Sequence, residues 1–307
     1  MSVVLVTGAS GFIGSSLCPA LVEAGHDVCA MTRHPDTYSG AGTPVEGDVS
    51  DPASLVEPMA GVDVAYYLVH SLGAHDFAAR DAAAAHAFAA AAAAAGVDRI
   101  VYLGGLGDDG DDLSPHLRSR REVEQILAAG PVPVTVLRAA VVIGHGGISW
   151  EITRQLVDHL PAMIAPRWVE TRTQPIALPD VVRYLVAVLG EPATSGRVFE
   201  IGGPDVLRYK DMMVRAAKIQ NRRGLPVFTV PLFTPHLSSY WLWLVTDVDV
   251  PTATNLIDSM TTEVVVHDHA IEELLGPARI GYEESVRLAL AVRAQAQGDD
   301  SSGPSPS

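Results

Sequence analysis

The chain has few basic residues. Its 307 residues include 21 lysines and arginines against 36 aspartates and glutamates, which gives a formal net charge of −15. Lysine is scarcest, because Lys210 and Lys218 are the only two. Nucleic-acid binding needs clustered positive charge to neutralise phosphates, so this composition argues against a nucleic-acid partner. Wherever the protein uses a cation, arginine has to supply it.

Cysteines and long apolar runs are also scarce. Cys18 and Cys29 are the only cysteines and form no C-x-x-C pair, so we expect reduced thiols. No apolar run approaches the ~20 residues that a membrane-spanning helix needs. The N-terminus enters an apolar strand without a preceding basic segment, which is unlike a signal peptide. We therefore expect a cytoplasmic protein with no membrane span.

Glycines are concentrated where the first predicted strand ends. The stretch Val3–Gly14 reads as a Val-rich strand, a glycine turn and the start of a helix predicted over Phe12–Ala24. Gly8 permits the tight turn, Gly11 lets a pyrophosphate approach the backbone, and Gly14 lets the helix pack against the strand. The spacing is G-x-x-G-x-x-G rather than G-x-G-x-x-G, so the interpretation depends on the flanking strand and helix. The stretch predicts a dinucleotide site whose contacts are Gly8, Ser10, Gly11, Phe12, Ile13 and Gly14.

Strands and helices alternate over the first half of the chain. The helical segments include an alanine-rich run at 78–95 and a second run at 114–129. The strand-like segments are Asp27–Thr32, Thr43–Glu46, Val62–Val69, Arg99–Leu103 and Val134–Leu137. This alternation without an internal repeat predicts an α/β Rossmann fold with a doubly wound parallel sheet. We expect an NAD(P)-binding domain over 1–145, a smaller C-terminal substrate region over 146–296 that is partly interleaved with it, and a disordered tail over 297–307.

The ends of the next strands supply further candidate cofactor contacts. Arg33 follows the second strand, and no carboxylate stands at positions 30–32. An arginine there accommodates the 2′-phosphate of NADP, whereas an acidic residue would bind the ribose hydroxyl of NAD. The sequence thus favours NADP(H) over NAD(H), with a solvated loop charge as the alternative role for Arg33. Asp48 and Val49 follow the third strand near the expected adenine, and Val69 and His70 end the fourth.

Other polar residues carry weaker signals. Asp76, Asp81 and His86 lie in or beside the alanine-rich helical segment, where we expect them to face solvent. The run His267-Asp268-His269 has no third ligand nearby in the sequence, so no metal site is predicted.

Several motifs resemble those of the extended and atypical short-chain dehydrogenases/reductases. These are Thr7–Gly14, Gly47–Val49 and Leu137–Gly144, followed by Gln174–Val181 and Phe199–Pro204. The resemblance covers roughly residues 1–290 and is greatest to the branch with NmrA-like regulators, YbjT-like proteins and the 39 kDa complex I subunit. It implies an NAD(P)-binding Rossmann fold but fixes no substrate.

The catalytic pair of that family is missing. Its enzymes carry Tyr-x-x-x-Lys on the helix after the fifth strand, and none of the eight tyrosines here has a lysine four residues later. The matching positions hold His116 and Arg120, whose i, i+4 spacing puts them on one helix face. The position of the carbonyl-orienting serine is Gly104 or Gly105.

These replacements leave two functions open. His116, with an unperturbed pKa near ~6.5, is a candidate general acid, although its place near a helix start is compatible with no chemical role. Arg120 is a candidate cofactor contact but cannot cycle a proton. The first hypothesis is NADPH-dependent reduction of a small carbonyl or enone. The second is a non-catalytic NADP(H)-binding redox sensor, regulator or assembly factor with a protein partner. A sugar-nucleotide epimerase or dehydratase needs the tyrosine and is disfavoured.

Overall fold

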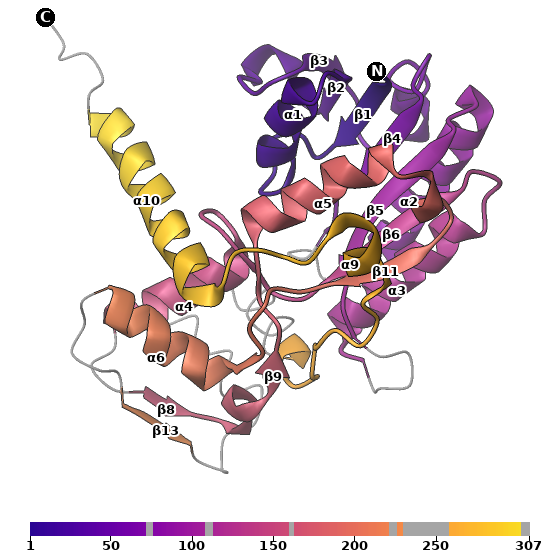
Figure 1. The fold of residues 1–307 in the computed structure, drawn as a ribbon. Helices are drawn as coiled ribbons and strands as arrows, with labels where there is room; N and C mark the ends of the chain where they lie inside the picture. Colours follow the sequence, from indigo (N-terminus) through magenta and orange to yellow (C-terminus); the bar gives the residue numbers. More distant parts are fainter. Residues whose placement is uncertain (72–75, 108–112, 160–162, 221–225, 230–257, 302–307) are drawn as a thin grey trace, which may run out of the picture.

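The fold is built on a seven-stranded parallel sheet with the order β11-β6-β5-β4-β1-β2-β3 (Figure 1). The computed structural model describes residues 1–71, 76–107, 113–159, 163–220, 226–229 and 258–301. The strands of the sheet are β1 Val3–Thr7, β2 Asp27–Thr32, β3 Thr43–Glu46, β4 Val64–Tyr67, β5 Arg99–Gly105, β6 Val134–Ala139 and β11 Val198–Ile201. The strand order reverses beside β1, which lies between β2 and β4. Doubly wound sheets bind ligands at such a switch point. The Rossmann fold class is therefore confirmed.

Helices cover both faces of this sheet. Helices α1 (Gly14–Glu23) and α5 (Leu178–Gly190) pack against each other on one face, and α2 (Phe77–Ala95) packs beside α3 (Pro115–Ala128) on the other. Leu17, Cys18 and Leu21 recur at helical spacing, which places them on one face of α1, and all three are fully buried. In α2 the alanines allow close packing around the buried ring of Phe88. The sheet is thus buried on both sides, as a parallel sheet requires.

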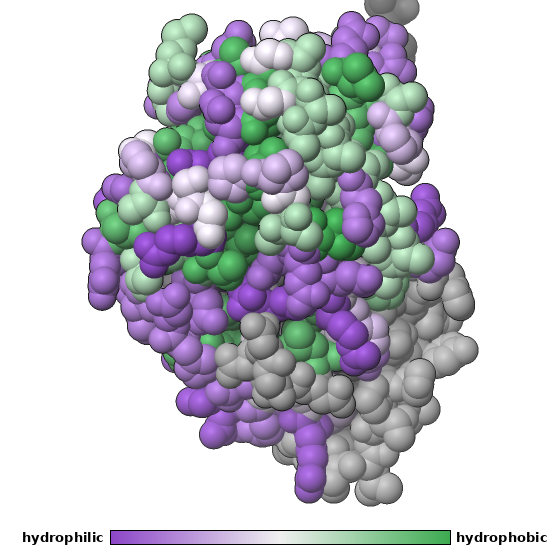
Figure 2. All heavy atoms as spheres, turned by 90° about the vertical axis from the view of Figure 1, so that its right-hand side faces the viewer, coloured by the Kyte–Doolittle hydropathy of each residue, from purple (hydrophilic) through white to green (hydrophobic). Residues whose placement is uncertain are grey.

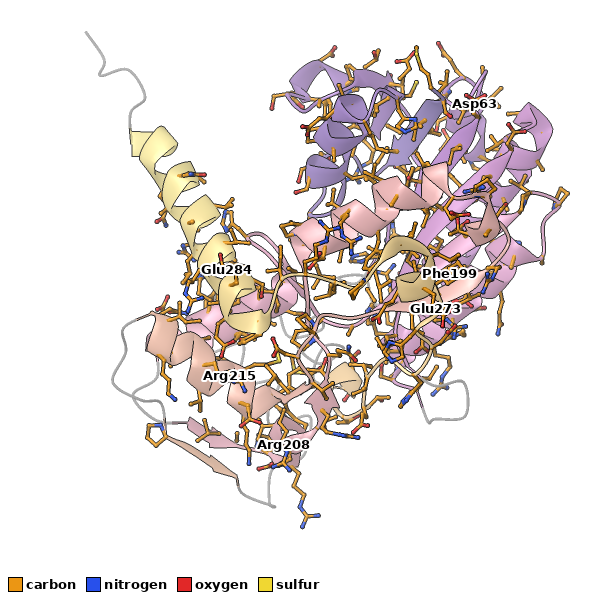
Figure 3. All side chains as sticks on the ribbon, in the orientation of Figure 1. Asp63, Phe199, Arg208, Arg215, Glu273 and Glu284 are labelled. Atoms are coloured by element: carbon orange, nitrogen blue, oxygen red, sulfur yellow. The ribbon has the colours of Figure 1, made fainter. Side chains whose placement is uncertain are left out.

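The second half of the chain forms a smaller lobe with its own apolar core. Helices α4 (Ile148–His159), α6 (Tyr209–Ile219) and α10 (Tyr282–Ser301) pack together, and Trp150, Met212 and Tyr282 are buried among them. Arg215 of α6 pairs with Glu283 of α10 at 3.0 Å, and Figure 3 shows Arg215 near this helix junction. The other elements are short: η1 Pro35–Thr37, η2 Pro52–Leu55, β7 Val142–Ile143, β8 Met163–Ala165, η3 Arg167–Glu170, β9 Arg172–Thr173, β10 Ile176–Ala177, η4 Pro192–Thr194, β12 Leu207–Arg208, β13 Val227–Thr229 and α9 Ala270–Leu275.

The two halves share elements. Strand β11 joins the edge of the main sheet beside β6, and α5 lies on its face, although both come after residue 145. The boundary at 145/146 remains a prediction about folding units. The tail expected over 297–307 also stays a prediction: residues 297–301 form the end of α10, while 302–307 lie outside the described residues.

The described surface is mixed in polarity. Figure 2 shows polar and apolar residues interspersed over one face. Within the described part of the chain, no helix is long and apolar enough to cross a membrane.

Candidate cofactor and active site

A cavity of about 660 Å³ opens at the carboxyl edge of the parallel sheet. This edge is opposite the one marked by Asp63, which precedes β4 and is labelled in Figure 3. The far wall comes from α3 and from residues of the smaller lobe, including Ser149, Tyr209 and Met260. Every site residue predicted from the sequence lines this cavity: Gly8, Ser10, Gly11, Phe12, Ile13, Gly14, Arg33, Asp48, Val49, Val69, His70, His116 and Arg120.

The glycine turn forms a close-packed cradle at one end of the cavity. Gly8 has φ +65°, a left-handed conformation that glycine adopts without strain. A Cβ on Gly14 would overlap the Gly8 carbonyl oxygen and lie 2.8 Å from the Ala9 Cα, so only glycine fits. A Cβ on Gly11 would lie 3.1 Å from the same oxygen. The cradle therefore lets α1 start directly against β1.

The N-terminus of α1 meets this cradle without a competing charge. Its N-cap residue Ile13 makes no side-chain capping hydrogen bond, and its first turn holds no acidic residue. Helix N-termini carry free N–H groups and partial positive charge, which suit a phosphate. Beside it, the Thr7 hydroxyl donates to the Tyr66 carbonyl at 2.9 Å and accepts from the Leu68 N–H at 3.0 Å, which fixes β1 against β4. The residues present thus fit the pyrophosphate of a dinucleotide.

Two arginines flank Asp48 at the adenine end. Asp48 Oδ1 accepts from the Ser50 N–H at 2.8 Å and from the Ser50 hydroxyl at 2.7 Å. The backbone hydrogen bond is the largest cause of the lowered pKa of Asp48, and the charges of Arg33 and Arg80 add to it. Arg80, from α2, also lines the cavity and was not predicted from the sequence. Arg33 and Arg80 thus both line the cavity close to Asp48.

Helix α3 presents His116 and Arg120 at the opposite end. The helix begins at Pro115, and the Ser114 hydroxyl caps it by accepting the Leu117 N–H at 3.2 Å. The Tyr102 hydroxyl of β5 donates to the Arg120 carbonyl at 3.1 Å. Both side chains line the cavity one helical turn apart.

A buried ion pair fixes α3 to the sheet. Glu124 accepts from Arg138 of β6 through both carboxylate oxygens, at 2.6 and 3.0 Å. Arg121 also pairs with this carboxylate, at 3.4 Å. Paired hydrogen bonds of this kind are strong and directional. The pair therefore fixes the orientation of α3 about its own axis. In this orientation, His116 and Arg120 line the cavity.

Both cavity histidines are held in the neutral form. Burial and then the charge of Arg120 lower the pKa of His116 to about 3. The pKa of His70, whose side chain is more exposed, is lowered in the same direction by partial desolvation, the charge of Arg120 and then that of His116. Neither imidazole therefore carries a proton to donate at neutral pH, which works against His116 as a standing general acid.

The prediction that Asp81 faces solvent is wrong. Its side chain is buried and accepts the Ser71 N–H at 2.9 Å, and the residue lines the cavity. Burial is the main cause of its raised pKa. Local sequence patterns do not show this burial, because it depends on how α2 packs near the residues that follow β4.

No hydroxyl occupies the position of the carbonyl-orienting serine. A Cβ on Gly104 would lie 3.1 Å from the Tyr102 ring, and one on Gly105 would lie 2.8 Å from a Leu117 methyl group. Packing side chains already take up this space. The site therefore lacks the Ser–Tyr–Lys set and has His116 and Arg120 in its place.

A family model described as NAD(P)H-binding matches residues 8–168. The match begins in the glycine cradle and extends past α3, so it covers both ends of the cavity. The chain belongs to this NAD(P)H-binding family. Together, the match, the fold and the motifs identify it as an atypical short-chain dehydrogenase/reductase.

Its curated relatives are distant. An uncharacterised protein of Mycobacterium tuberculosis is 27% identical over 225 residues, 73% of this chain, but the chain spans only 24% of that protein. A Streptomyces griseus protein named (4-alkanoyl-5-oxo-2,5-dihydrofuran-3-yl)methyl phosphate reductase is 28% identical over 231 residues, which are 71% of this chain and 74% of that protein.

Solved structures share the fold at lower identity. MoeE5, in complex with UDP-glucose and NAD, has a TM-score of 0.73 and 21% identity, and the match covers 96% of this chain and 99% of that one. The triphenylmethane reductase of Citrobacter sp., in complex with NADP(H), has a TM-score of 0.74 and 17% identity over 93% of this chain and 99% of that one. One holds NAD and the other NADP(H), so the fold alone does not determine the nucleotide.

Proposed function

We propose that the chain is an NADPH-dependent reductase of a small carbonyl compound or enone. The observation that carries the proposal is the shared cavity, since the glycine cradle and the His116–Arg120 face of α3 line one space. Its volume of about 660 Å³ lies within the range typical of small-molecule sites. The reductase name of the Streptomyces griseus relative also supports a reduction.

NADP(H) is the proposed cofactor because of the charges at the adenine end. Arg33 and Arg80 both lie close enough to Asp48 to lower its pKa, so a 2′-phosphate there would meet two cations. Asp48 keeps its carboxylate oriented toward Ser50 rather than toward either arginine. The pyrophosphate would lie on the cradle and the N-terminus of α1, with Ser10, Phe12 and Ile13 around it.

The bound cofactor would supply a hydride to the electrophilic carbon of the substrate. The oxygen or α-carbon that receives the displaced electron pair then needs a proton. His116 is the proposed donor because it lines the substrate end of the cavity. Its low pKa in the free protein means that it must gain this proton when the substrate binds. Arg120, which cannot give up a proton, would hold ligand oxygens beside it.

A panel of small ketones, aldehydes and enones with NADPH tests the reductase activity. We expect turnover of at least one compound, followed as the loss of NADPH absorbance, and we expect His116→Ala to lower kcat about 100-fold or more. His86→Ala is the matched control, because His86 is exposed on α2. If His116→Ala turns over as fast as the wild type, His116 is not the proton donor.

A second candidate function is a non-catalytic NADP(H) sensor or regulator. The specific observation in its favour is the replacement of the Ser–Tyr–Lys set by Gly104 or Gly105, a neutral His116 and Arg120. This candidate predicts tight NADPH binding without turnover of any compound in the panel. It also predicts a protein partner whose affinity for the chain changes between NADP+ and NADPH.

A further inference from the structure

The Arg120 side chain is a cation without an ion-pair partner in the described part of the chain. It is half-buried and lines the cavity. The neighbouring Arg121 differs, since it pairs with Glu124 and donates to the Gly107 carbonyl at 2.8 Å. A charge withdrawn from water is costly unless an opposite charge compensates it. Arg120 is therefore placed as a ligand-binding arginine would be.

Two imidazoles adjoin this guanidinium. His116 precedes Arg120 by one turn of α3, and His70 extends from the end of β4, which pairs with β5 beneath Arg120. Asp81 on α2 lies close enough for the charge of Arg120 to lower its pKa, but its carboxylate accepts from the Ser71 N–H and no ion pair joins the two side chains. The phenol groups of Tyr67 and Tyr102 complete the surroundings, and burial raises the pKa of both. This end of the cavity thus offers several N–H donors and a guanidinium that has no ion-pair partner among the described residues.

We propose that Arg120, His70 and His116 bind an oxyanion carried by the substrate, a carboxylate or a phosphate monoester, beside the group that is reduced. A guanidinium binds either anion through two parallel hydrogen bonds, and imidazole N–H groups can add to them. The inference rests on the proposed function, because it assigns this end of the cavity to the substrate.

An anion at this site would change the protonation of the histidines. Burial and the charge of Arg120 disfavour the imidazolium form of His116, and a bound anion offsets both. The substrate would then bring His116 its proton, and the proton donor would exist only in the substrate complex. Hydride and proton are consumed together, and His116 regains its proton from water when the next substrate binds.

Histidine NMR on the protein saturated with NADP+ tests this site. Saturation with NADP+ fills the phosphate sites at the cradle and the adenine end. Inorganic phosphate and acetate are then titrated separately against a chloride control of equal ionic strength, with His70 and His116 signals assigned from the H70Q and H116Q variants. The titrations are run near pH ~7, where both anions are ionised and both imidazoles start in the neutral form. We expect phosphate, acetate or both to shift the His70 and His116 ring nitrogen signals toward those of imidazolium, and the stronger anion identifies the substrate class.

Arg120→Gln separates a binding role from a structural one. We expect the response of the histidine signals to the anions to be at least about tenfold smaller in this variant than in the wild type. The variant should melt no lower than the wild type, because an uncompensated charge is removed. Arg118→Gln is the control on the same helix, and its anion response should match the wild type. An unchanged response in Arg120→Gln overturns the proposal. So does the absence of any response in the NADP+ complex, whereas failure to bind NADP+ overturns the proposed function and the substrate assignment with it.

Discussion

His116 and Arg120 lie one turn apart on α3, and the charge of Arg120 adds to burial in holding the pKa of the His116 imidazole at about 3. In the enzymes that this chain resembles, a lysine at the second position lowers the pKa of a tyrosine at the first. The same spacing has a different consequence here, because a nearby cation removes the proton from an imidazole. Chemistry at this site therefore depends on what neutralises Arg120.

Stability should respond to the protonation of His116. Its pKa in the folded protein is about 3, below the ~6.5 of an unfolded chain. Between these values the unfolded state binds more protons, so the free energy of unfolding falls as the pH drops through this window. We expect His116→Gln to reduce this slope in urea titrations from about pH 7 to about pH 5. A slope equal to that of wild type and of the His86→Gln control would show that His116 titrates normally.

The glycine cradle should tolerate no side chain at Gly14. A Cβ there would overlap the Gly8 carbonyl oxygen and approach the Ala9 Cα to 2.8 Å. We expect Gly14→Ala to destabilise the fold by about 1–3 kcal/mol, as overpacking does, and to abolish NADPH binding. Gly190→Ala, at the end of α5, is the matched control because its added Cβ meets nothing within 4 Å. A Gly14→Ala protein that binds NADPH normally would contradict the cradle.

Breaking the ion pair beneath α3 should cost more unfolding free energy than breaking an ion pair on the surface. Removing the Glu124 carboxylate leaves Arg138 without this partner, and both side chains are largely buried, at 9% and 13% exposed. We expect Glu124→Ala to cost about 3–5 kcal/mol of unfolding free energy. Glu284→Ala breaks the pair with Arg287, in which both side chains are 57% exposed, and should cost less than about 1 kcal/mol. Urea denaturation of both variants checks this, and equal losses would contradict the structural role of Glu124.

The elements near the cofactor could be predicted because they depend on local sequence. Strands β2 and β3 have the expected bounds, since apolar periodicity and turn residues define them. The cradle depends on three glycines within one turn. The burial of Asp81 and the contribution of Arg80 depend instead on how α2 packs over the sheet, and local patterns do not show this.

The far wall of the cavity was harder to predict for the same reason. Tyr209 and Met260 reach the cavity from the smaller lobe, and only the tertiary fold brings them to the end of α3. The low pKa of His116 is also a tertiary effect, because it depends on burial as well as on Arg120. The sequence could therefore place His116 on the correct helix face but could not give its charge.

Calorimetric titration with NADPH and NADH tests the central claim most directly. We expect wild-type protein to bind NADPH more tightly than NADH. Arg33→Ala, which removes charge-assisted hydrogen bonds worth about 1.5–3 kcal/mol, should weaken NADPH binding about 10- to 100-fold and leave NADH binding nearly unchanged. Arg80→Ala should act in the same direction, and Arg167→Ala, an exposed arginine in η3, should have no effect. Equal affinity for the two nucleotides, or a NADPH preference that survives Arg33→Ala, would contradict the assignment of NADP(H) to this cavity.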